Sequence, residues 1–136
     1  MTERTDSEHH KQGMAVRRAV LGDKYVDAAG ARSTPFTASF QDFITRSAWG
    51  DVWTRPGLDR GTRSVITITT LLALGHDAEL RIHLRGALNN GLSREEIGEI
   101  FLHAAIYAGV PASNTAFGIA QEVFASIDAE DGDAED

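Results

Sequence analysis

The stretch that decides the fold is residues 76–91, with the sequence HDAELRIHLRGALNNG. Its apolar residues recur every three or four positions, which is the period of one face of an α-helix. These residues are Leu80, Leu84, Ala87 and Leu88. Because Asn89-Asn90-Gly91 is a typical helix end, the pattern predicts a helix from Asp77 to about Asn89.

A second face of this helix carries His76, Glu79 and His83 at spacings of three and four, with Gly86 one turn further on. Three interpretations fit this stripe. Glu79 can orient His83 and raise its basicity, so that the imidazole gives or takes a proton near neutral pH. The three side chains can instead bind a metal, or Glu79 and His83 can form an ordinary surface pair.

The flanking sequence also favours helices. Asp59 can cap a helix that runs through the β-branched run 65–70 to Gly75, and Ser93 with Glu96 forms a capping box for the next helix. Further helices are expected from about Glu8 to Leu21, from Pro35 to about Trp49 and from Pro111 onward. No convincing strand appears. We therefore predict an all-α, single-domain bundle of five to six helices.

The predicted domain covers residues 14–125. Residues 1–13 are expected to be a flexible N-terminus, and residues 126–136 an acidic disordered tail, since six of the acidic residues lie in 128–136. That tail carries most of the net charge of −7, so the body of the chain is nearly neutral. Such a balance allows a small anionic ligand but indicates no nucleic-acid surface.

A second set of candidates surrounds the only two tryptophans, Trp49 and Trp53. They form either a buried corner or the wall of a pocket. Arg46, Arg55 and Arg63 flank them, and a guanidinium binds a carboxylate in bidentate fashion, so each is either a clamp for a substrate carboxylate or a surface ion pair.

Composition excludes several classes of function. The chain has no cysteine, which excludes thiol nucleophiles, cysteine-bound zinc and dithiol redox chemistry. Neither a membrane-spanning apolar run nor a signal peptide is apparent. We expect a cytoplasmic protein. His103 and Tyr107, one helical turn apart, are expected to be a partly buried histidine and its partner.

Two blocks of sequence carry a resemblance to a known family. Residues 45–64, TRSAWGDVWTRPGLDRGTRS, and 71–117, from LLALGHDAELRIHLRG to GVPASNTAF, resemble the gamma-carboxymuconolactone decarboxylases. The second block is shared more loosely with the alkylhydroperoxidase-like superfamily, whose Cys-x-x-Cys-x-x-x-His pattern reads His76, Glu79 and His83 here. Without the cysteines, the peroxidase reaction is excluded. Ala108 stands where many of the decarboxylases carry a cysteine.

The resemblance implies an alkylhydroperoxidase-like all-helical fold, a homohexamer, and decarboxylation of gamma-carboxymuconolactone in protocatechuate catabolism without a metal or organic cofactor. Catalysis would fall to Glu79 and His83. Substrate binding would fall to the three arginines, the two tryptophans and His76. Two alternatives stay open at this point. One is a non-catalytic helical oligomer that binds an anionic lactone or aromatic acid, and the other is a decarboxylase of a related carboxylated lactone.

Overall fold

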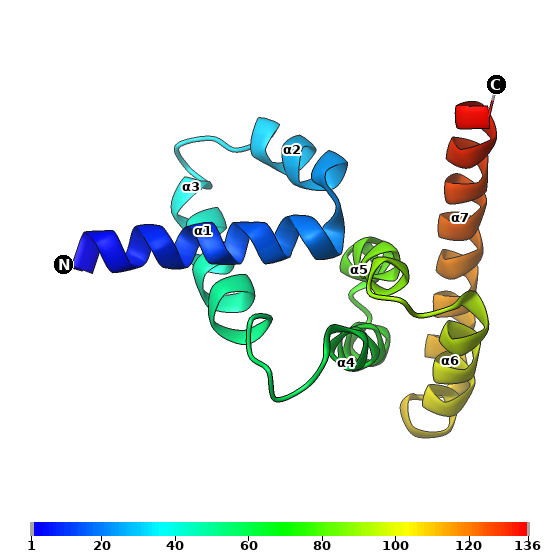
Figure 1. The fold of residues 1–136 in the computed structure, drawn as a ribbon. Helices are drawn as coiled ribbons and strands as arrows, with labels where there is room; N and C mark the ends of the chain where they lie inside the picture. The colour runs from blue at the N-terminus through cyan, green and yellow to red at the C-terminus, as the bar shows by residue number, and fades with distance from the viewer. Residues whose placement is uncertain (1, 136) are drawn as a thin grey trace. The chain divides into compact units, whose positions relative to one another are not determined.

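The computed structural model describes residues 2–135, and all the regular secondary structure in that range is helical, with seven α-helices and one π-helix (Figure 1). The helix count is therefore slightly above the predicted five to six. The contacts divide the chain into an N-terminal unit, residues 1–63, and a C-terminal unit, residues 64–136. No helix among the described residues is both long enough and apolar enough to cross a bilayer.

The N-terminal unit contains α1 (Thr2–Leu21), α2 (Asp23–Ala31), α3 (Ala38–Ile44) and the π-helix η1 (Thr45–Val52). The structure adds one helix to those expected in this unit and changes another. Residues 23–31 form a helix, because Val26 is buried and Arg18 of α1 binds the side chains of Asp23 and Asp27. The expected single helix from Pro35 to Trp49 starts three residues later and becomes a π-helix at Thr45.

Two glycines allow α1 and η1 to pack closely. A Cβ placed on Gly13 would lie 2.9 Å from the backbone nitrogen of Gly50, and closer still to the carbonyl oxygen of Thr45. Gly50 in turn leaves room for the ring of His9, whose Nε2 lies 2.5 Å from Asp51 Oδ1. Glycine is required at residue 13 because the two backbones approach so closely.

The C-terminal unit holds most of α4 (Arg60–Leu74), followed by α5 (Asp77–Asn89), α6 (Arg94–Ala108) and α7 (Val110–Glu135). The predicted starts of α4, α5 and α6 and the predicted ends of α4 and α5 are confirmed. Asp59 Oδ1 accepts a hydrogen bond from the Thr62 amide at 2.7 Å, and the capping box of Ser93 and Glu96 is formed. The β-branched run is helical, because Ile68 and Leu72 point into the core.

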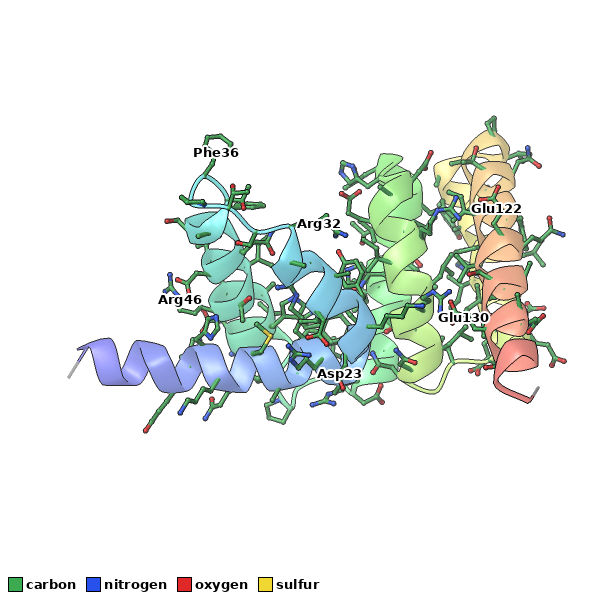
Figure 2. All side chains as sticks on the ribbon, turned by 90° about the horizontal axis from the view of Figure 1, so that it is seen from above. Asp23, Arg32, Phe36, Arg46, Glu122 and Glu130 are labelled. Atoms are coloured by element: carbon green, nitrogen blue, oxygen red, sulfur yellow. The ribbon has the colours of Figure 1, made fainter. Side chains whose placement is uncertain are left out.

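Helix α7 continues past residue 125, where the sequence predicted a disordered tail. Ion pairs explain the difference: within the segment, Glu130 pairs with Arg85 of α5 and Asp128 with Arg94 of α6, and just before it Glu122 pairs with Arg81. Figure 2 shows Glu122 and Glu130 on α7. Part of the acidic segment is thus bound to arginines of the same unit. Likewise, α1 is helical from Thr2, within the range predicted to be flexible.

The core of the C-terminal unit is built from all four helices. Its fully buried large side chains are Ile68, Leu80, Leu84, Ile97 and Phe101. The ring of Phe101 meets that of Phe117 edge to face, with the centroids 5.5 Å apart. This packing fixes one face of α5 against its neighbours and so determines which way its histidines and glutamate turn.

Candidate active site

Helix α5 places His76, Glu79 and His83 in three different environments. His76 is the exposed N-cap residue, Glu79 lies exposed in the first turn, and His83 is half-buried in the middle of the helix. Leu80 and Leu84, on either side of His83 along the helix, are buried in the core. His83 therefore combines an anchored backbone with a side chain that is only partly withdrawn from solvent.

Two opposing effects act on the His83 imidazole. Burial lowers its pKa from the usual 6.5, because the charged form loses hydration, and the negative charge of Glu79 acts in the opposite direction. Burial is the larger effect, so the pKa of His83 is lowered. The predicted effect of Glu79, which is to raise the basicity of His83, is present, but burial has the larger effect on the pKa. The lowered pKa favours the neutral form of the imidazole, which suits hydrogen-bond donation to a developing negative oxygen.

The metal interpretation of this stripe finds no geometric support. Across the part of the chain that the structure describes, no group of three histidine, aspartate or glutamate side chains is placed to hold a metal ion.

Trp49 and Trp53 are buried at 4% and 9% exposure, and their rings stack with centroids 5.1 Å apart. They lie in and directly after η1, where Trp53 follows the last π-helical turn. A π-helix is rare and recurs at functional sites, because it shifts side chains out of the normal helical register. The sequence indicated a special segment here but not its π-helical backbone.

The three candidate arginines differ in how they are engaged. Arg46 binds Asp42 at 2.8 Å, and Arg63 donates a hydrogen bond to the carbonyl oxygen of Arg55 at 3.1 Å. The side chain of Arg55 is exposed and makes no ion pair with any residue the structure describes. Of the three, Arg55 is the most available to a carboxylate. All three arginines and both tryptophans belong to the N-terminal unit, whereas Glu79 and His83 belong to the C-terminal unit.

The structure differs from one other prediction in the C-terminal unit. His103 and Tyr107 stack with ring centroids 5.4 Å apart, but both are exposed, so the expected burial of His103 is wrong. Arg81 and Arg85, on the same helix as His83, bind acidic residues of α7.

One buried charge was missed from the sequence. Arg17 is only 7% exposed, although it lies on a helix read simply as amphipathic. A signal was present, because Gly13, Val16, Arg17 and Val20 share the spacing of one helix face, and the other three are buried. A charged residue inside an apolar stripe marks a position that needs explanation.

Comparison with known proteins supports the family resemblance that the two quoted sequence blocks indicate. Residues 38–122 match the carboxymuconolactone decarboxylase family. The chain is 51% identical to the 4-carboxymuconolactone decarboxylase of Acinetobacter baylyi, over 90% of this chain and 91% of that protein. It is 44% identical to the nitrosuccinic acid decarboxylase npaB of Metarhizium robertsii, over 87% and 85% of the two chains. A 4-carboxymuconolactone decarboxylase of Pseudomonas putida is 46% identical over 34% of this chain and 96% of its own. This chain belongs to the carboxymuconolactone decarboxylase family.

Proposed function

We propose that this protein is a carboxy-lyase that converts gamma-carboxymuconolactone, also called 4-carboxymuconolactone, to the enol-lactone of beta-ketoadipate and carbon dioxide. The observation that carries the proposal is the 51% identity, across nearly the whole of both chains, to a relative of that name. The reaction would serve protocatechuate catabolism, and the chain's lack of cysteine accords with a cytoplasmic location.

The substrate supplies its own electron sink. The departing carboxylate is attached to a ring carbon that is joined, through the ring double bond, to the lactone carbonyl. When that carbon–carbon bond breaks, its electron pair moves through the ring to the carbonyl oxygen and gives a dienolate. The carbon next to the carbonyl then takes up one proton. No metal or organic cofactor is needed for this electron flow, so the proposed reaction is cofactor-independent.

His83 is the proposed donor to the dienolate oxygen. A neutral imidazole offers one N–H, and a donor held in a partly dry site stabilises developing negative charge more strongly than water does. Glu79 would position the ring and, through its charge, offset part of the effect of burial on the pKa of His83. His76, at the exposed start of the same helix, is a candidate for contact with the substrate's outer edge.

Binding of the acetate arm is assigned to an arginine. Arg55 is favoured over Arg46 and Arg63, because its guanidinium forms no ion pair within the described part of the chain. A guanidinium on the acetate carboxylate anchors the substrate by a group that does not react. If the guanidinium bound the carboxylate that must leave, it would stabilise the ground state and slow the reaction. Trp49 and Trp53 are proposed to keep water from the scissile group.

A second candidate substrate is favoured by one specific observation. The Metarhizium robertsii relative is named a nitrosuccinic acid decarboxylase and is 44% identical over most of the chain. A nitro group, like the lactone carbonyl, can accept the electron pair that carbon dioxide leaves behind. The alternative is therefore decarboxylation of a nitro-substituted dicarboxylic acid by the same donor arrangement.

The chain is also proposed to assemble with itself, as a homohexamer. Large apolar side chains stand exposed at 58% or more in both units: Phe36, Phe40, Phe43, Leu74, Leu102, Ile106, Tyr107 and Val110. Phe36 projects from the turn ahead of α3 (Figure 2). So many large, exposed apolar side chains are typical of a chain that packs against another chain. Light scattering on a sizing column measures the mass, and a monomer would contradict this part of the proposal.

The test of the activity is a pair of substrate assays with chelator-treated protein. Ultraviolet absorbance follows freshly generated gamma-carboxymuconolactone, a nitrosuccinate assay runs in parallel, and carbon dioxide release is measured in both. We expect rapid, metal-independent turnover of the lactone. Turnover of nitrosuccinate alone would support the second candidate. Saturable binding of the lactone without carbon dioxide release would contradict the proposed activity and indicate a binding protein.

A further inference from the structure

The buried Arg17 lines a cavity of about 290 Å³ within the N-terminal unit. The cavity lies among α1, α2, α3 and the start of η1, and every residue that lines it falls between residues 10 and 45. It takes no part in the proposed decarboxylation, whose assigned residues all lie from Arg46 onward. Arg17 is thus a nearly buried positive charge beside an open volume.

The guanidinium of Arg17 is poorly satisfied by the protein. Its two terminal nitrogens donate to Thr45 Oγ1 at 3.3 Å and to Gln41 Oε1 at 3.4 Å, both neutral acceptors and both at long range. Its Nε is buried and makes no hydrogen bond. No carboxylate among the described residues forms an ion pair with it. Burial lowers the pKa of Arg17, and Tyr25 and Arg18 are the nearby charged or titratable groups that act on it. An arginine nevertheless stays charged in proteins.

The remaining charges around the cavity are already matched. Asp27 binds Arg18 at 2.8 Å, and Asp42 binds Arg46 at 2.8 Å. His10 lies 3.7 Å from Asp42. Asp23 also binds Arg18, at 3.0 Å. Arg17 itself forms no ion pair with any of these carboxylates, and a buried charge without a direct partner is costly.

The rest of the lining decides the class of ligand. Met14, Val26, Ala29 and Ala38 add apolar groups to the lining, beside the polar groups around Arg17. A volume of about 290 Å³ is at the lower end of the range for small-molecule pockets. We propose that this cavity binds a small organic monocarboxylate, with the carboxylate on the Arg17 guanidinium and an apolar body against these side chains.

The test uses benzoate as the probe and neutral benzamide, which has the same shape, as its control. Isothermal titration calorimetry on the full chain should show that benzoate binds at millimolar concentration and benzamide at least about tenfold more weakly, as loss of a charged hydrogen bond predicts. Equal binding of the two probes, or binding of neither, would overturn the proposal. Inorganic phosphate is a third probe, and displacement of benzoate by phosphate at equal concentration would overturn the organic-carboxylate specificity.

Two variants locate the binding. Arg17→Met removes the charge at similar volume, and Gln41→Glu supplies an internal carboxylate 3.4 Å from the guanidinium, so both should abolish the preference for benzoate. Arg32→Met, an exposed arginine outside the lining, is the matched control and should bind like the wild type. Circular dichroism checks the fold of each variant. If His83→Ala loses benzoate binding while both Arg17→Met and Gln41→Glu keep it, the ligand occupies the proposed active site and this proposal is wrong.

Discussion

Replacing Gly13 by alanine tests the close packing of α1 on η1. The added Cβ would lie 2.9 Å from the Gly50 backbone nitrogen and closer to the Thr45 carbonyl, so backbone atoms must move apart. Overpacking of this kind costs about 1–3 kcal/mol, and the rigid backbone neighbours place this case at the upper end. Alanine recovers up to about 1 kcal/mol through its better helix propensity. The net expected loss in the free energy of unfolding is about 2 kcal/mol.

Gly30→Ala is the matched control, because Gly30 also lies in a helix of the N-terminal unit and nothing stands within 4 Å of its added Cβ. That variant should gain roughly 0.4–1 kcal/mol. Thermal unfolding followed by circular dichroism should show the Gly13→Ala midpoint lowered by roughly 6–10 °C and the Gly30→Ala midpoint unchanged or raised. If Gly13→Ala proves as stable as Gly30→Ala, the two backbones do not approach as described.

Three further outcomes are expected. Phe101→Ala should lower the free energy of unfolding by about 3–5 kcal/mol in urea titrations, since the ring is fully buried, and a loss below about 1 kcal/mol would contradict its place in the core. The pKa of His83 is lowered in the folded state, so the unfolded state binds the proton first as the pH falls. The free energy of unfolding should therefore decrease as the pH drops from 6.5 toward the pKa of the folded state. His83→Gln should remove this part of the pH dependence of the urea midpoint. The acid limb of the pH profile of kcat/KM should lie below pH 6.5. In Glu79→Gln it should move to still lower pH, because the variant loses the negative charge that favours the imidazolium. A move to higher pH would refute the proposed interaction.

Local signals predicted the fold wherever they were strong. The capping box at Ser93 and the Asp59 cap set two helix starts as expected, and the positive-φ glycines at 75 and 91 set two helix ends. Residues 23–31 have no clean apolar period, and their helix depends on burial of Val26 and on ion pairs with Arg18 of the preceding helix. Contacts with a neighbouring helix are not visible in local periodicity.

For the candidate site, helical spacing predicted the proximity of Glu79 and His83 but not the net electrostatic effect on His83. Helical spacing placed Glu79 and His83 on one face, and the Glu79 charge does act on His83. The net direction of the pKa shift depends on burial by surrounding side chains, which spacing cannot supply. The acidic segment was predicted to be disordered for a related reason. Its partners Arg85 and Arg94 lie more than thirty residues earlier in the chain, so local sequence does not indicate the ion pairs.

The most direct test of the central claim is the turnover number for gamma-carboxymuconolactone with His83→Ala, measured beside the wild type and His103→Ala. His103 is an exposed histidine of the same unit with no proposed role, so its loss controls for the removal of an imidazole. We predict that His83→Ala lowers kcat by about 10²–10³, the usual effect of removing one oxyanion donor, while His103→Ala stays within a few fold. A correctly folded His83→Ala protein with nearly wild-type kcat would contradict the assignment of His83.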